Sequence, residues 1–103
     1  MSVTVKKGNY GFVITFNVKN SDGTAKNLTG YTVTLKVWVL GAASVKFTGA
    51  CTVTDASGGV CTYTVAETNF DTVGSYLAEL ELTRSGVVED TETFPILVEA
   101  TAP

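Results

Sequence analysis

Apolar and polar side chains alternate along most of this chain with a period of two residues, which is typical of half-buried β-strands. Residues 12–19 show the pattern clearly, because Phe12, Ile14, Phe16 and Val18 occupy the even positions. The same alternation recurs in residues 3–6, 31–40, 45–55, 61–65, 76–83 and 87–98. It predicts seven to eight short strands whose apolar positions face a shared core.

Turn-forming residues separate these stretches. Glycine occurs with serine or aspartate at residues 21–24, 56–59 and 85–86, and a longer loop spans residues 66–75. No stretch has the period of an amphipathic helix. Short strands with turns every eight to twelve residues or so are typical of a β-sandwich. We therefore predict an all-β fold, an immunoglobulin-like antiparallel β-sandwich, in one domain of residues 1–103.

Two details of the pattern predict local features of the strands. Pro95 lies within the last stretch, and a proline cannot donate a ladder hydrogen bond, so this strand is expected at an edge or bulged there. Val45 and Phe47 follow the loop of residues 41–44 and are expected to form a short inward-facing pair.

One apolar side chain breaks the rule of its strand. In residues 31–40 the odd positions are apolar, yet Trp38 and Leu40 occupy even positions on the face that Lys36 marks as polar. Exposed aromatic anchors are typical of protein interfaces. The alternative is that the loop of residues 41–44 folds over Trp38. The pattern therefore nominates Trp38, Leu40 and Lys36 as interface residues and leaves this alternative open.

The composition supports a folded domain. Of the 103 residues, 45% are hydrophobic and 17% are charged, which is too apolar for a disordered chain. The apolar run at residues 37–40 is far shorter than a membrane-spanning helix, and no secretory signal is visible at the N-terminus. The net charge of −3 disfavours nucleic acid binding. We expect neither a membrane nor a nucleic acid as a partner.

The charges are divided unequally between the two halves of the chain. Residues 1–50 contain every basic residue except Arg84, and residues 51–103 contain every acidic residue except Asp22. Interleaved strands could pair the two halves within the fold. The same division could instead create a basic face and an acidic face that favour head-to-tail association. We favour the first interpretation, because exposed ion pairs are common and contribute little.

The side chains offer no familiar catalytic or metal-binding set. The chain has no histidine, which removes the usual general base and the commonest transition-metal ligand. Its clustered carboxylates lie on predicted strands, where a solvated acidic face is the simplest explanation; they are Glu79, Glu81, Glu89, Asp90 and Glu92. We predict a protein that is not an enzyme and that has no metal or cofactor.

The two cysteines lie on the arms of a predicted hairpin. Cys51 and Cys61 share the inward parity of Val53 and Tyr63. A loop of residues 54–58 would place the cysteines directly opposite each other, whereas a tighter turn would place Cys61 opposite Val53. Two buried free thiols are the commoner state for a protein made in a cytosol. We favour free thiols, with a disulfide as the alternative.

Residues 71–78 resemble the motif that ends in the second conserved cysteine of immunoglobulin domains. Asp71, Gly74 and Tyr76 match its D-x-G-x-Y pattern, with one extra residue before the glycine. The resemblance implies a tyrosine corner, in which the hydroxyl of Tyr76 bonds to the backbone of the preceding loop. Ala78 stands where the cysteine would be, so the disulfide between the sheets is absent.

Nearly the whole chain resembles the N-terminal domain family of phage baseplate upper proteins. Five pieces match this family in order and spacing: residues 8–11 (GNYG), 22–25 with 27–30 (DGTA and NLTG), 59–63 (GVCTY), 71–79 (DTVGSYLAE), and Gly86 with 92–95 (ETFP). The departures are Asn9 and Asn27, where the family has aspartates, and Val73, where it has a proline. Members of the family continue beyond this domain, so the chain is either an excised domain or a small stand-alone virion protein.

The resemblance implies a non-enzymatic structural component of a phage virion, made in the bacterial host cytoplasm. Its partners would be other virion proteins, contacted in repeated copies of an assembly. Capsid or neck decoration of a phage is an alternative, as is a bacterial immunoglobulin-like adhesion module. A carbohydrate-binding module is a further alternative, but it requires several exposed aromatic side chains, and the sequence nominates only Trp38, Tyr10 and Phe70.

Overall fold

Within residues 1–102, the regular secondary structure consists of strands, as the alternating pattern predicts. The structure is a computed structural model that describes residues 1–102, so Pro103, the last residue of the expected domain, lies outside the described residues. Residues 1–102 form nine strands: β1 (Val3–Lys6), β2 (Val13–Asn17), β3 (Thr32–Val39), β4 (Phe47–Ala50), β5 (Thr52–Asp55), β6 (Val60–Thr64), β7 (Gly74–Arg84), β8 (Val87–Asp90) and β9 (Phe94–Glu99). These residues include no helix of the length and apolarity that crossing a membrane requires.

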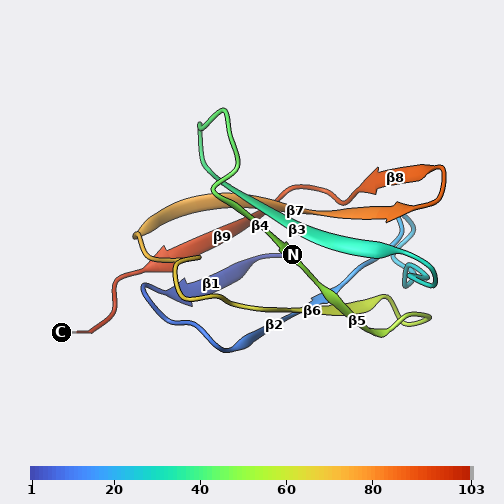
Figure 1. The fold of residues 1–103 in the computed structure, drawn as a ribbon, viewed down its shortest axis with the longest axis horizontal. Helices are drawn as coiled ribbons and strands as arrows, with labels where there is room; N and C mark the ends of the chain where they lie inside the picture. Colours follow the sequence, from blue (N-terminus) through green and yellow to red (C-terminus); the bar gives the residue numbers. More distant parts are fainter. Residues whose placement is uncertain (103) are drawn as a thin grey trace.

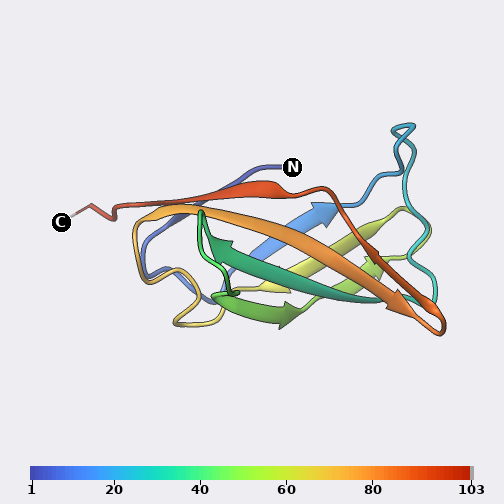
Figure 2. The same cartoon turned by 90° about the horizontal axis from the view of Figure 1, so that it is seen from above.

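The strands form two sheets that lie one above the other (Figure 1). The six-stranded sheet has the order β1-β9-β7-β3-β4, and β8 also pairs with β7. The three-stranded sheet has the order β2-β6-β5. Figure 2 shows β9, β7 and β3 running side by side along the molecule. The expectation of a fully antiparallel fold is wrong in one place, because β1 pairs with β9 in parallel.

Two predicted strands are each divided in the structure, which is why nine strands replace the expected seven to eight. Residues 47–55 leave the six-stranded sheet and enter the other sheet at Cys51, whose N–H donates to the carbonyl of Val33 at 2.9 Å. The last stretch is interrupted at residues 91–93, where the N–H of Thr91 still donates to the carbonyl of Leu80 at 2.9 Å. Neither the passage of the chain from one sheet to the other nor the break before β9 changes the two-residue period, so the sequence pattern does not reveal them.

The interruption explains the position of Pro95. β9 lies between β7 and β1, but its pairing with β1 begins only at Ile96. Pro95 therefore has a partner on the β7 side and none on the β1 side, which suits a residue without an N–H. The predicted edge position is thus a local one at the start of β9.

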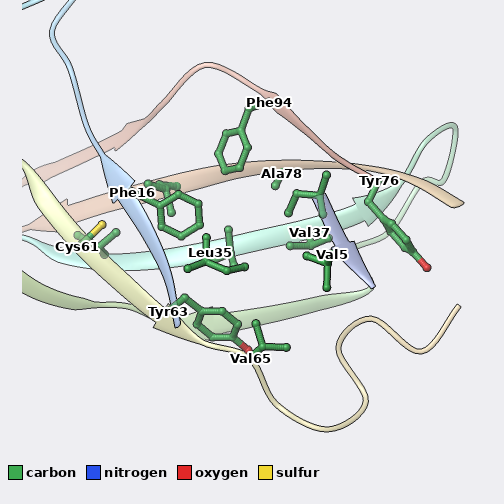
Figure 3. Packing of buried hydrophobic residues seen from close by; sticks show 14 of the residues in the cluster. Val5, Phe16, Leu35, Val37, Cys61, Tyr63, Val65, Tyr76, Ala78 and Phe94 are labelled. Atoms are coloured by element: carbon green, nitrogen blue, oxygen red, sulfur yellow. The ribbon is translucent and has the colours of Figure 1, made fainter. Parts of the chain in front are cut away.

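The core lies between the two sheets and uses one parity of each strand. Figure 3 shows side chains from both sheets meeting there. The ring centroids of Phe16 on β2 and Phe94 on β9 are 5.6 Å apart, so this pair joins the sheets directly. Leu35, Val37 and Leu80 are fully buried by the alternation of β3 and β7. This burial provides the main hydrophobic stabilisation of the fold.

Three apolar residues that the pattern assigns to the core are exposed. Val39 is 44% exposed, because it is the last residue of β3. Val45 is 50% exposed, because the chain leaves the sheet after β3 and returns only when β4 begins at Phe47. Phe12 is 37% exposed, because it precedes the first paired residue of β2. Phe47 is partly buried against the core, as expected.

The cysteine hairpin adopts the register of the tighter turn. Val53 pairs with Cys61, and the register shifts between Val53 and Asp55. Cys51 and Cys61 are free thiols in the structure. The pKa of the Cys51 thiol is raised, mainly by a hydrogen bond with the thiol of Cys61 and secondly by burial. Cys51 therefore remains protonated at neutral pH.

Candidate docking surface

The outer face of the six-stranded sheet contains the interface residues nominated from the sequence. In β3 the side chains of Val33, Leu35 and Val37 are buried in the core, so Lys36 and Trp38 point outward. Both outward residues are half-buried. Leu40 follows the end of β3 and is 63% exposed. The face assignment from the alternating pattern is confirmed, whereas the role of this face in binding stays a prediction.

Strand register aligns Trp38 with apolar side chains from two other strands. Trp38 pairs with Leu77 on β7, and Leu77 pairs with Pro95 on β9. We call these three residues the apolar row. Leu97 lies two positions further along β9 on the same face and is 43% exposed. The sheet therefore presents a continuous apolar band across three strands, beside Leu40.

The loop between β3 and β4 forms a wall beside Trp38. Figure 1 shows this loop rising from the sheet on the side away from the three-stranded sheet. Trp38 and residues 42–45 line a small, open hollow of about 170 Å³. The loop thus shields part of the indole, which accords with the alternative weighed from the sequence, but Trp38 remains partly accessible. A partner could reach both the indole and the loop.

A group of carboxylates adjoins the apolar row. The ammonium of Lys36 lies 2.8 Å from a carboxylate oxygen of Glu81 and 3.6 Å from carboxylate oxygens of both Glu79 and Asp90. We call these three acidic residues the carboxylate cluster. The hydrogen bond to Glu81 is the main cause that raises the pKa of Lys36, so the lysine stays charged. Three carboxylates share one ammonium group, so the cluster keeps an excess of negative charge.

Ion pairs elsewhere account for the unequal charges of the two halves of the chain. Every ion pair found within residues 1–102 joins a lysine of the first half to a carboxylate of the second half. Lys6 pairs with Glu99, and Lys26 pairs with Glu89. Pairing within the fold, the favoured interpretation of the sequence, is therefore what the structure contains. Separate basic and acidic faces are not needed to explain the division.

Tyr76 closes one end of the sandwich. Its side chain is 2% exposed, and its hydroxyl donates to the carbonyl of Thr72 at 2.7 Å, within the loop stretch expected from the sequence. Figure 3 shows its oxygen pointing away from the buried cluster. Gly74 has a φ of 155°, which favours glycine at the start of β7. Asp71 accepts a hydrogen bond from Lys46 at 3.1 Å, which lowers the pKa of its carboxyl.

The aromatic side chains do not form the platform that a carbohydrate site would need. Phe70, nominated as a loop aromatic, is fully buried, because its ring packs edge-on against Phe47 and Tyr76 at centroid distances of 5.4 and 6.3 Å. Its nomination for a carbohydrate site is wrong. Tyr10 is 56% exposed but lies in the loop between β1 and β2, outside the sheet that contains Trp38. No shared aromatic surface is formed by these residues.

A wider hollow lies at the edge between the sheets, but its lining does not suggest chemistry. It measures about 450 Å³ and lies between residues 17–21 and residues 90–94. Its ionisable side chains are Lys19, Asp90 and Glu92, and Asp90 is already close to Lys36. Within the described part of the chain, no group of three or more histidine, cysteine, aspartate or glutamate residues could hold a metal ion.

Comparison with known proteins identifies the family. A family model described as the BppU N-terminal domain matches residues 3–102. The chain belongs to this family. The N-terminal domain of phage TP901-1 ORF48 has a similar fold, with a TM-score of 0.74 and 20% sequence identity over 94% of this chain and 83% of that chain. No curated protein matches the sequence.

Membership in this family confirms the resemblance inferred from the five sequence pieces. This BppU N-terminal domain is a structural component of a phage baseplate, and hence of the virion. The family is a structural one, and baseplate membership implies contacts with other virion proteins. It favours the baseplate over the capsid, neck and bacterial-surface alternatives.

Sequence reasoning missed part of the surface that adjoins Trp38. Leu77, Pro95 and Leu97 have the outward parity of their strands, and this parity was the only available signal. The alternating pattern already placed Leu77 on the outward face of its strand, opposite to the core positions. Its position beside Trp38 depends on the pairing of β3 with β7, which the period does not reveal.

Proposed function

We propose that this BppU N-terminal domain docks onto another baseplate protein through the outer face of its six-stranded sheet. Trp38 and Leu40 would lie at the centre of the contact, with Lys36 at its border. The observation that carries the proposal is the apolar row, in which Trp38 pairs with Leu77 and Leu77 with Pro95. A band of this kind on a solvated sheet face is unfavourable in water and favourable when a partner covers it.

The exposure of the neighbouring side chains supports the same face. Leu40 is 63% exposed, Leu97 is 43% exposed and Val45 is 50% exposed. All three border the apolar row or the loop beside Trp38. A contact with an aromatic centre and a polar rim is typical of protein interfaces. The lysine and threonine side chains of the outer face would provide part of that rim.

The assembly context follows from the family. We propose that the domain is used in repeated copies, because baseplate proteins act within symmetric assemblies. We also propose that the chain is made in the cytoplasm of the bacterial host and forms one domain over residues 1–103. Its action would be mechanical attachment, without a bound cofactor.

We assign the fold to the immunoglobulin-like sandwiches as part of this proposal. Two features support the assignment. The chain crosses between the sheets at Cys51, and the hydroxyl of Tyr76 bonds to the backbone of Thr72, as in a tyrosine corner. Ala78 in the position of the usual cysteine marks the difference from antibody domains.

The test is to assemble phage particles with Trp38→Ala and to measure the amount of this protein per purified particle. Tyr10→Ala is the matched control, because Tyr10 is also an accessible aromatic residue but lies outside the outer face. We expect Trp38→Ala to fold and to be lost from particles, and Tyr10→Ala to be retained. Loss of a central aromatic anchor costs about 2 kcal/mol or more in binding.

Two results would argue against the proposed face. Normal incorporation of a folded Trp38→Ala protein would place the contact elsewhere. Unfolding of the isolated variant would show that the fold itself requires Trp38, and Leu97→Ser would then test the same face through a more exposed residue. Retention of the Leu97→Ser protein at the wild-type amount would reject the face.

A further inference from the structure

The outer face of the six-stranded sheet also contains information about the chemistry of its partner. Lys36 and Trp38 are two residues apart on β3, and Glu79 and Leu77 are two residues apart on β7. Because Lys36 pairs with Glu79 and Trp38 pairs with Leu77, the carboxylate cluster directly borders the apolar row. A protein that covers the row must therefore approach the cluster.

The cluster is not neutral by itself. Glu79, Glu81 and Asp90 surround one ammonium group, and no second cation is paired with any of them among the described residues. Their side chains are 23%, 30% and 44% exposed, so water now solvates the excess negative charge. Covering the apolar row would remove part of this water, which is unfavourable unless a new positive charge replaces it.

We infer that the partner presents a lysine or arginine side chain to the carboxylate cluster while an apolar part of its surface covers the row. This inference rests on the proposed docking face and specifies the partner's chemistry. Opposite charge would steer the approach and set the register of the contact. A second copy of this chain meeting face to face fits less well, since it would bring two acidic clusters into one interface without adding a cation.

The experiment compares Glu79→Lys with Glu67→Lys in assembled phage particles. Both variants make the same change in charge, but Glu67 is exposed in the loop between β6 and β7 and is not part of the six-stranded sheet. Lys36 keeps Glu81 and Asp90 as partners when Glu79 is replaced, so the fold should persist. The amount of this protein per particle is measured after washes at increasing NaCl concentration.

We expect Glu79→Lys to lower the retained amount about tenfold or more and Glu67→Lys to leave it unchanged. The milder variant Glu79→Gln should be retained less than wild type at low salt and should depend less on NaCl, because one attractive charge is missing. If Glu79→Lys does not fold, Glu79→Gln alone decides the matter through this change in salt dependence.

The outcomes separate this inference from the proposed docking face. If Glu79→Lys is retained as well as wild type while Trp38→Ala is lost, the face is correct and the cationic partner is rejected. If Trp38→Ala is retained as well as Tyr10→Ala, the docking face itself is rejected, and the inference fails with it.

Discussion

The inner and outer faces of β3 and β7 belong to the same two strands, yet their side chains differ in how deeply they are buried. On the inner face Leu35 and Leu80 are fully buried against the other sheet. On the outer face Lys36 and Trp38 remain half-buried, although each of them adjoins the fully buried Val37 in the chain. In each of these strands, alternate residues stabilise the fold, and the remaining residues form the candidate docking surface.

The largest difference in stability is expected when one side chain on each face is truncated. We expect Leu35→Ala to lower the free energy of unfolding by about 2–5 kcal/mol, because it leaves a cavity in a fully buried site. Thr34→Ala, one residue away on the outer face, should cost about 0.5 kcal/mol or less. Urea denaturation of both variants checks this. Similar losses in the two variants would contradict the division.

The inner face also has a position where adding atoms should be costly. A Cβ added at Gly49 on β4 would collide with the ring of Tyr63. That ring already stacks on Phe47 with a centroid distance of 6.2 Å, so it has little room to move. We expect Gly49→Ala to lower the free energy of unfolding by about 1–3 kcal/mol. Ala50→Ser, on the outer side of the same strand, is the control and should unfold like wild type.

At one end of the core, the hydroxyl of Tyr76 donates a hydrogen bond to the carbonyl of Thr72, and this contact is expected to stabilise the fold. Tyr76→Phe removes the donor that satisfies the carbonyl of Thr72 and keeps the ring that packs against Phe70. We expect a loss of about 1–2 kcal/mol in the free energy of unfolding. Denaturation of Tyr10→Phe, a tyrosine for which no side-chain hydrogen bond occurs in the described residues, serves as the control. An unchanged midpoint for Tyr76→Phe would argue against a stabilising tyrosine corner.

Exposed charges outside the core should contribute less to stability, and their contribution should disappear at low pH. Hydrogen bonds from Lys26 and Tyr31 hold the pKa of Glu89 below its ordinary value of 4.5. The ionised form is favoured in the folded state, so its contribution is present above 4.5 and is lost as the pH falls through the lower, folded pKa. We expect Glu89→Gln to lower the denaturation midpoint slightly near neutral pH. The difference from wild type should vanish once the pH is well below 4.5. A difference that persists there would show that charge is not the cause.

The smallest effect is expected from reducing agent. Cys61 is a buried free thiol on β6, and Cys51 is a partly buried free thiol where the chain passes from β4 to β5. We therefore expect the denaturation midpoint to be the same with and without dithiothreitol. Mass spectrometry of unfolded, unreduced and alkylated protein should find both cysteines modified. A mass lower by two hydrogens with no alkylation would instead reveal a disulfide.

Local pattern predicted the strands better than it predicted their pairing. The parity of residues 31–40 correctly separated Val37 from Trp38, because a strand turns alternate side chains to opposite faces. Val45 was wrongly assigned inward, because its parity was read through a loop that leaves the sheet. Phe70 was wrongly nominated as an exposed aromatic residue. It lies in a loop, but its side chain points into the core and its ring packs against Phe47 and Tyr76.

The amino-acid sequence by itself determined the strands, the turns, the buried parity and the family pieces, since each depends on residues close together in the chain. Only the tertiary structure decided that β1 joins β9 in parallel, that residues 47–55 change sheets, and that Trp38, Leu77 and Pro95 form one row. Pairing depends on contacts between distant segments and on the register they adopt. The candidate docking surface is built from such contacts, so its residues could be nominated singly from the sequence but assembled only by the fold.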